Sequence, residues 1–561
     1  MNEPRESTIG AWLGWLFAAS ALVYGMILAI GPQYALSVPT SERPILLVLG
    51  LYLVACALYF FALSKAITLR SSRGLTAWVL ITSAVFRLIL LFSPPFQEID
   101  IYRYLWDGAV VAMGEDPYAF PPEAVVTGLE GAGAPEEPRL AKLVDHARSN
   151  PALEEIVRTI HYGHLPSPYP PVSQAVFFAA AATSPDSWSA DARLRWLKAF
   201  LVLCDLITLL LVVDLLRMTS MPVGWAVAYG WCPLVMKEIA GSGHLDAIAT
   251  LLTVAACSAA LRGFGKTPRS LSWSIIASVL LGLGVGAKLF PVVLAPLLAA
   301  GILKRHGWRA TVMGAAAFLL TCLITLAPML LIKTSPAEVK DTELAKGAAE
   351  SLPPPPDIDA DQSTGKTAGL AAFLKQWEMN DLIFMVLLEN LQWQPERSAS
   401  PAPWFDLTPN HWSEPLREQH TKVFLITRGL TLLALLAIAL LVAWRSTRRL
   451  GERARGARDW LNAAFLTLAW FWLLAPTQNP WYWCWAAPLL PFARRRAWLA
   501  VSCVGFAYYL RFWLEEHFPE PGLLGTPYDG QYFFYYVVPW LEFLPIFIWL
   551  LIEHRRRGAA L

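Results

Sequence analysis

Long apolar segments separated by short polar turns run through most of the chain. Crossing about 30 Å of hydrocarbon takes about 20 apolar residues. The segments that reach this length are 10–31, 45–64, 75–94, 197–217, 222–240, 244–261, 310–333, 422–444, 459–476, 497–513 and 534–552. Residues 271–303 predict two shorter helices broken near Gly286, Ala287 and Lys288, and 480–493 predict another short helix. The pattern predicts an all-α, polytopic integral membrane protein with about 14 transmembrane helices.

Clusters of Lys and Arg lie at alternate ends of successive spans. They follow the second span (Lys65, Arg70, Arg73) and later occur at 262–269, 304–309, 445–458, 494–496 and 555–557. Cytoplasmic loops carry such clusters, so these turns and both termini are expected in the cytoplasm. The apolar stretch 169–184 would invert this order if it crossed fully. We therefore interpret it as a re-entrant or partial helix.

This topology divides the chain into five regions and places two large loops on the extracytoplasmic face. The regions are N-terminal transmembrane helices (1–94), a first extracytoplasmic loop (95–168), a transmembrane core (169–333), a second extracytoplasmic loop (334–421) and C-terminal transmembrane helices (422–561). The first loop is expected to form short helices on the membrane surface. In the second, 346–366 has the Pro-rich composition of a disordered linker, and 367–393 is expected to form an amphipathic helix.

Composition agrees with a chain that is embedded in a membrane. Of its residues, 56% are hydrophobic and 16% charged, whereas soluble domains carry about 25% charged residues. The formal net charge of +2 gives no electrostatic reason to expect nucleic acid as a partner. The seven cysteines form no CxxC pair, which excludes a zinc knuckle and a disulfide framework.

The first extracytoplasmic loop begins with the most informative polar residues. Glu98 and Asp100 lie two residues apart, just outside the third span, where water meets hydrocarbon. A carboxylate there could take a proton from a polar acceptor while an apolar donor tail stays in lipid, provided that it reaches the hydroxyl by a hydrogen bond. The alternative is that both side chains are merely solvated.

The chain resembles the bacterial polytopic glycosyltransferases of the C superfamily, in particular the alpha-mannosyltransferase-like group that uses polyprenyl-phosphate sugars. The resemblance extends over most of residues 75–490. Its motifs are Asp100-Ile-Tyr-Arg-Tyr-Leu-Trp-Asp-Gly108, Asp116-Pro-Tyr118, Tyr169-Pro-Pro171, Gly243-His-Leu-Asp-Ala247, Lys288-Leu-Phe-Pro291 and Asn479-Pro-Trp-Tyr482. Leu245 departs from the family pattern, which has Asn at that place. The first motif is the most specific, and the others gain weight from their order.

The resemblance implies a membrane glycosyltransferase that moves a hexose, mannose in this group, from a polyprenyl-phosphate donor to an extracytoplasmic lipid or glycan acceptor, with inversion. Asp100 would be the catalytic base, with Glu98 assisting or holding a metal. The donor phosphate would meet Arg103, His244 and Lys288, with Arg87 a further cation. The implied substrate contacts are Tyr102, Trp106, Asp246, Trp481 and Tyr482. No metal ligand is assigned, and Mg²⁺ or Mn²⁺ on Glu98, Asp100 and Asp246 stays an alternative to metal-independent transfer.

Several of these residues have a structural alternative. Arg103 could pair with Glu98 or Asp107, and Lys288 with Asp205 or Asp214, two carboxylates better suited to structural pairing than to catalysis. His244 and Asp246 could cap a helix. Trp481 and Tyr482 suit an interfacial aromatic belt as well as a sugar platform. His161 and His164 have a spacing that could bind metal, and Asp357, Asp359 and Asp361 fit a solvated linker.

Two functions of other classes remain open at the level of sequence. A transporter or flippase for lipid-linked sugars would explain the spans and the charges within them, but not the Tyr- and Trp-rich first loop. Transporters often contain paired halves with broken helices at matching places, and no such repeat is visible here. A non-catalytic subunit of a cell-envelope assembly is the second alternative.

Overall fold

The structure is a computed structural model, and it describes residues 3–131, 133, 135–330, 377–391, 403–407, 420–450 and 453–558. Within these ranges the regular elements are helical, and one isolated backbone bridge joins Met379 to Thr477. Ten helical segments of the described chain are long and apolar enough to cross a membrane. They contain α1 (Glu3–Ile30), α2 (Ile45–Ala66), α3 (Arg73–Leu91), α9 (Ala190–Met218), α12 (Asp246–Gly263), α13 (Ser270–Ala287), α15 (Trp308–Leu330), α19 (His420–Thr447), α21 with α22 (Ala497–Val504, Leu510–His517) and α23 with α24 (Gly530–Tyr536, Val538–Gly558). The chain is an all-α, multi-pass membrane protein, as predicted.

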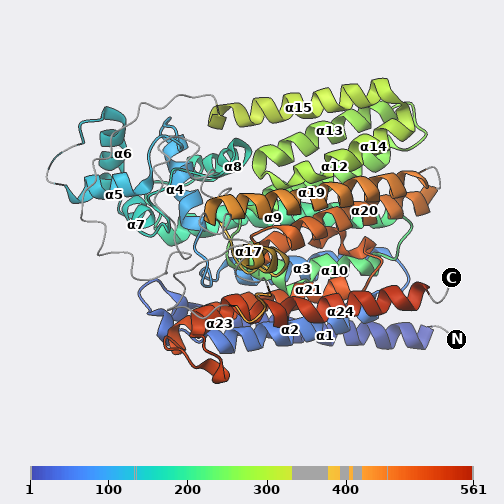
Figure 1. Cartoon of the computed structure of the whole chain (residues 1–561), viewed down its shortest axis with the longest axis horizontal. Helices are drawn as coiled ribbons and strands as arrows, with labels where there is room; N and C mark the ends of the chain where they lie inside the picture. The colour runs from blue at the N-terminus through green and yellow to red at the C-terminus, as the bar shows by residue number, and fades with distance from the viewer. Residues whose placement is uncertain are drawn as a thin grey trace.

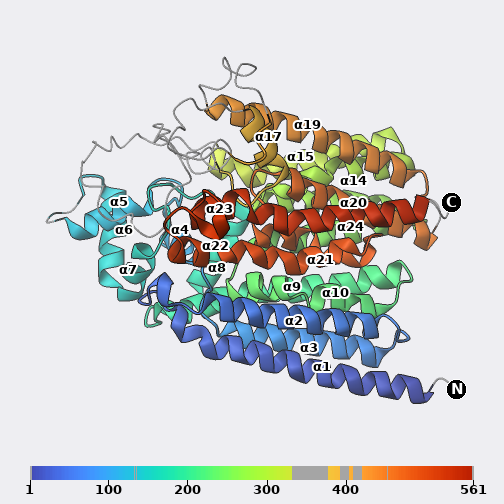
Figure 2. The same cartoon turned by 60° about the horizontal axis from the view of Figure 1, so that its bottom comes forward.

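The spans lie side by side and give the bundle two distinct ends (Figure 1). Both termini lie at one end, here called the terminal end, and the helices of the first loop lie at the other, the loop end (Figure 2). These loop helices are α4 (Ile101–Ala112), α5 (Pro122–Glu130), α6 (Pro138–Ser149) and α7 (Pro151–Arg158). The first loop is thus helical, as expected, and lies opposite both termini.

Hydrogen bonds between basic residues and neighbouring turns hold the terminal end together. Arg458 Nε donates to the carbonyl of Thr219 at 2.7 Å. His306 Nε2 lies 2.9 Å from the carbonyl of Gly263, and the Arg496 amide donates to Glu553 at 3.2 Å. Turns that are far apart in sequence but rich in Lys and Arg therefore meet at one end, as the predicted alternation requires.

The apolar stretch after the first loop forms a short helix, α8 (Pro171–Ala182). Its 12 residues extend about 18 Å, well short of the hydrocarbon thickness. Trp196 of α9 donates to Thr183, just beyond its end, at 2.8 Å, so the chain turns back there. The prediction of a partial helix is confirmed.

The predicted span at 222–240 is not one continuous helix. Four pieces replace it: η3 (Val223–Ala226), α10 (Val227–Gly230), α11 (Pro233–Val235) and the π-helical η4 (Met236–Gly241). Pro222 and Pro233 have no amide N–H to continue a helix, and apolar content alone did not reveal this.

Other spans are also interrupted, so the number 14 stays a prediction. The break after α13 is confirmed, with η5 (Phe290–Leu294) and α14 (Ala295–His306) following Lys288. Residues 480–493 form η7 (Pro480–Trp485) and η8 (Ala487–Phe492), and η9 (Gly505–Tyr509) separates α21 from α22. Helix α20 (Arg453–Leu474) is continuous, and α17 (Ile383–Leu391) lies within the predicted amphipathic helix 367–393. The predicted linker 346–366, with its alternating aspartates, lies outside the described residues.

Candidate functional site

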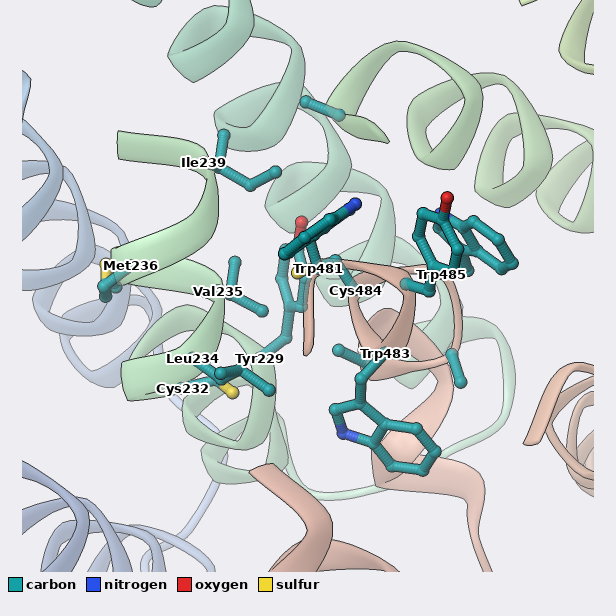
Figure 3. Packing of buried hydrophobic residues seen from close by; sticks show 14 of the residues in the cluster. Tyr229, Cys232, Leu234, Val235, Met236, Ile239, Trp481, Trp483, Cys484 and Trp485 are labelled. Carbon is teal, nitrogen blue, oxygen red and sulfur yellow. The ribbon is translucent and has the colours of Figure 1, made fainter. Parts of the chain in front are cut away.

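Most of the predicted site residues lie where a helix starts or is interrupted. Glu98 and Asp100 precede α4, His244 lies between η4 and α12, and Lys288 separates α13 from η5. Trp481 and Tyr482 belong to η7. Figure 3 shows the tryptophans of η7 pointing in different directions beside the segment that contains Val235 and Ile239.

Lys288 and Asp246 form the first polar centre of the site. Lys288 has extended backbone angles (φ −158°, ψ 141°), and its Nζ lies 2.8 Å from Asp246 Oδ1. Trp485 Nε1 donates to the same oxygen. The ammonium also lies 4.4 Å from the centroid of the Tyr482 ring, a cation–π contact. The Asp246 side chain is fully buried whereas that of Lys288 is 20% exposed, so part of the Lys288 side chain remains accessible.

A second polar centre surrounds His244. The His244 ring stacks on Trp481, with centroids 4.4 Å apart and planes 9° from parallel. Its Nε2 lies 3.2 Å from Glu238 Oε2, and Lys237 Nζ lies 3.4 Å from the same oxygen. Tyr509 donates to the other oxygen of Glu238 at 2.5 Å. All of these side chains are buried.

Sequence reasoning missed Glu238 and Tyr509 as parts of the site and noticed Lys237 only as a buried charge. A signal was present, because adjacent Lys and Glu within an apolar stretch are expensive in a membrane and are usually functional.

Glu98 and Asp100 lie beside these centres at the start of α4. Glu98 accepts a hydrogen bond from Tyr508 at 2.9 Å. Burial raises the pKa of Glu98, and the negative charge of Asp100 raises this pKa further. Asp100 is only half-buried and does not cap α4 with its side chain. No described side chain is hydrogen-bonded or ion-paired to the Asp100 carboxylate.

Electrostatic effects on Tyr104 place Asp100 and Asp246 near one phenol. The pKa of Tyr104 is raised mainly by burial, and Tyr169, Asp100 and Asp246 each raise it further. The rings of Tyr104 and Tyr169 meet edge to face, with centroids 4.9 Å apart. Sequence reasoning did not single out Tyr104. The two carboxylates therefore share a neighbourhood although 145 positions lie between them.

Gly243 brings the start of α4 against the turn that carries His244 and Asp246. Its φ is +76°, and a Cβ at this position would lie 2.4 Å from Ile101 Cδ1. Both the positive φ and the close approach favour glycine. The Gly-His-x-Asp motif thus joins two separate parts of the site.

Arg103 lies in a different contact network. Its Nε donates to Asp107 at 2.9 Å, and its Nη1 donates to the carbonyl of Leu165 at 3.0 Å. Asp107 also accepts from Ser167 and, at 3.0 Å, from Gln174. Of the two alternative partners, the structure shows Asp107 and not Glu98. Arg103 holds the segment that leads into α8.

Tyr102 and Trp106 are not brought to the Lys288 and His244 centres by any contact in the described chain. Burial raises the pKa of Tyr102 to about 12, and Asp191 and Glu155 contribute to the rise. Tyr102 therefore lies toward α7 and the start of α9. Trp106 is 2% exposed. Tyr104, and not Tyr102, is the tyrosine of α4 whose pKa Asp100 and Asp246 raise.

The structure decides between the remaining alternatives for Lys288, Trp481 and Tyr482. Arg87 pairs with Asp205 at 2.5 Å, and Arg262 pairs with Asp214 at 2.8 Å. Lys288 therefore has neither of the carboxylates expected as its structural partners. Trp481 and Tyr482 are 6% and 8% exposed, so the aromatic-belt interpretation is wrong for both.

The described residues contain no group of three or more His, Cys, Asp or Glu side chains that could hold a metal ion. The suggested set of Glu98, Asp100 and Asp246 is not among such groups, and the Oδ1 atom of Asp246 is bound by Lys288 and Trp485. His161 and His164 do not form such a group either, and burial lowers the pKa of both.

Comparison with known proteins gives one match. The family model described as "Alpha-(1->6)-mannopyranosyltransferase, N-terminal domain" matches residues 8–304, which is more than half of the chain and includes Glu98, Asp100, His244, Asp246 and Lys288. No curated protein matches the chain, and no solved structure matches it.

Proposed function

The chain belongs to the alpha-(1->6)-mannopyranosyltransferase family and is a membrane mannosyltransferase, and we propose that it takes mannose from a polyprenyl-phosphate donor with inversion, using Asp100 as general base. The acceptor is a lipid or glycan hydroxyl at the loop end of the bundle. Membership of an enzyme family favours this function over the transporter and the assembly subunit.

The observation that carries the proposal is the unengaged carboxylate of Asp100 beside a buried cation centre. Every other carboxylate of the site has a partner: Glu98 has Tyr508, Glu238 has Tyr509, and Asp246 has Lys288. A general base must be free to approach the hydroxyl that it deprotonates. Asp100 is the group that meets this requirement.

In the proposed step, the acceptor oxygen forms a bond to the anomeric carbon as its proton passes to Asp100. The bond between that carbon and the donor phosphate oxygen breaks from the opposite side, which inverts the configuration. The electron pair of the broken bond leaves with polyprenyl phosphate, whose charge becomes more negative. Cationic groups aimed at that oxygen stabilise the transition state.

Lys288 and His244 are the cations proposed to meet the leaving phosphate. The accessible fraction of Lys288 allows its ammonium to bind phosphate while Asp246 fixes its position. Trp481 holds the His244 ring by stacking, and Tyr482 lies against the ammonium. Both aromatic rings act through these cations, and their remaining faces are proposed to contact the sugar. Arg103 is not included because no contact in the described chain brings it to the Lys288 and His244 centres; its contacts are with Asp107 and Leu165.

Glu98 is proposed to assist Asp100. Its raised pKa favours a neutral carboxyl at pH values where an ordinary carboxyl is ionised. A neutral Glu98 can donate a hydrogen bond to the acceptor without adding a second negative charge next to the base.

The sidedness of the reaction follows from the distribution of charge. The basic turns and both termini gather at the terminal end, whereas α4, which directly follows Asp100, lies at the loop end (Figure 1). Basic turns mark the cytoplasmic face. We therefore propose that the site opens to the extracytoplasmic face of the plasma membrane.

Transfer of radiolabelled mannose from polyprenyl phosphate in proteoliposomes tests the proposal. Asp100→Asn should lower the rate of transfer by a factor of between about 10² and 10⁴ while donor binding persists. Asp145→Asn is the matched control, because Asp145 lies in the same loop region but is 69% exposed and pairs only with Arg148 among the described side chains. Full activity of Asp100→Asn would refute the base. Equal transfer from a nucleotide sugar without polyprenyl phosphate would refute the donor, and an alpha-linked product from an alpha-linked donor would refute inversion.

A further inference from the structure

A cationic pocket lies at the terminal end, between the α2–α3 turn and the turn that joins α9 to η3. Its volume is about 590 Å³. Arg70 and Arg73 line it from the first turn and Arg217 from the second, and no acidic residue lines it. It is a different feature from the mannosyl-transfer site, which lies at the loop end.

The three arginines are available to a ligand. No described carboxylate is ion-paired to Arg70, Arg73 or Arg217. The nearest acidic residue along α9, Asp214, is engaged by Arg262 at 2.8 Å. Three guanidinium groups around one cavity repel one another unless an anion joins them, and the planar guanidinium fork matches phosphate oxygens.

The backbone around the pocket is fixed in a form that favours an anion. Ser72 caps α3 by accepting from the Leu75 amide at 3.0 Å. Ser71 accepts from the Val223 amide at 3.0 Å, which ties the two turns together. The 19-residue α3 thus begins in the wall of the pocket with the positive end of its dipole there.

Exposed apolar side chains lie along the two helices that reach the pocket, α9 and α3. Leu203, Leu210 and Arg217 are spaced by seven residues on α9 and therefore lie on one face of the helix. Leu203 is 57% exposed and Leu210 is 51% exposed. Ile81 and Leu88 of α3 are also spaced by seven and are 62% and 53% exposed. A ligand that joins a phosphate to hydrocarbon chains matches both the cations and this surface.

We propose that the pocket binds the phosphate group of an anionic membrane lipid, whose chains lie along the exposed face of α9. The lipid occupies the leaflet at the terminal end, so its site is separate from that of the donor. Basic pockets between transmembrane helices near an anionic leaflet are suited to such headgroups. This proposal does not depend on the identity of the mannosyl donor or of the base.

The test is native mass spectrometry of the full chain purified in detergent and titrated with phosphatidylglycerol. The pocket variant carries Arg70→Gln, Arg73→Gln and Arg217→Gln. The control variant carries Lys266→Gln, Arg269→Gln and Arg309→Gln, which remove the same charge from exposed residues of the same end that do not line the pocket. We expect the pocket variant to bind phosphatidylglycerol more weakly by on the order of a hundredfold, and the control to bind within about threefold of the unmodified chain.

Two further arms distinguish the ligand sources. Phosphatidylcholine should bind at least tenfold more weakly than phosphatidylglycerol, and inorganic phosphate alone should bind only in the millimolar range. If phosphatidylglycerol binding were weakened equally in both variants, the binding would be due to general surface charge and not to the pocket. Inorganic phosphate that binds as tightly as the lipid would overturn the lipid assignment. Melting temperature and mannosyl transfer, measured for both variants, confirm that each is folded, because neither set of residues contacts the transfer site.

Discussion

Removing Lys288 should cost more stability than removing Asp246, because the two side chains of this ion pair differ in burial. In Lys288→Met, the fully buried Asp246 keeps only the Trp485 N–H. Breaking a buried pair in this way costs about 3 kcal/mol or more. In Asp246→Asn, the remaining ammonium is 20% exposed and still lies over Tyr482, so we expect a loss of about 1–2 kcal/mol.

The double variant separates pairing from catalysis. Asp246→Asn combined with Lys288→Met leaves no unpaired charge, so the free energy of unfolding should return to within about 1 kcal/mol of the unmodified chain. Mannose transfer should nevertheless stay at least about 10²-fold low, because the cation for the leaving phosphate is absent. Equilibrium unfolding in mixed micelles with increasing SDS measures the first quantity, and the proteoliposome assay measures the second. A double variant that recovers both stability and transfer would show that Lys288 serves only to neutralise Asp246.

Two other predictions use matched positions. Gly243→Ala places a Cβ at φ +76° and 2.4 Å from Ile101, so this variant should lose about 1 kcal/mol of stability and also lose mannose transfer. Gly307→Ala is the matched control, because Gly307 has φ +81° but nothing within 4 Å of the added Cβ. This control should lose stability but keep transfer. The pKa of Glu98 is raised in the folded chain, so ionisation of Glu98 lowers the free energy of unfolding of the unmodified chain as the pH rises above about 4.5. Glu98→Gln does not ionise, so its stability relative to the unmodified chain should increase over the same rise in pH. Glu115→Gln should show the opposite sign, since a hydrogen bond from a lysine lowers the pKa of Glu115. Melting curves at pH 4 and 7.5 check both, and equal pH profiles would contradict the prediction.

The apolar pattern was sufficient to predict the long helices. Its period and length do not depend on tertiary contacts, so α1, α2 and α3 appear close to their expected bounds. Continuity was harder to predict. Residues 222–240 are as apolar as an uninterrupted span, but Pro233 lacks an amide N–H at the start of α11, and the π-helix η4 follows it.

Site residues could be predicted from the sequence where a charged side chain is costly in a membrane. They could not be predicted where the role of a side chain depends on which residue it contacts in the fold. Lys288 and Asp246 were singled out as buried charges, but spacing along the chain gave no means to pair them across 41 intervening residues. Arg103 and Tyr102 lie next to Asp100 in sequence, yet the helical geometry of α4 directs them to other neighbours. Tyr508 could be assigned to Glu98 only from the fold.

The interruptions in the helices explain why the polar groups of this site can exist within a membrane protein. A broken helix leaves backbone groups without partners, and such backbone is tolerated at membrane depth only where protein or water surrounds it. Here His244, Lys288 and Trp481 all lie at such breaks, on segments whose surroundings are buried. At these breaks the side chains meet partners from other segments: His244 stacks on Trp481, and Lys288 reaches Asp246. Gly243 and the prolines of η5 and η7 therefore act through the backbone, and the geometry of the candidate site depends on where these helices stop.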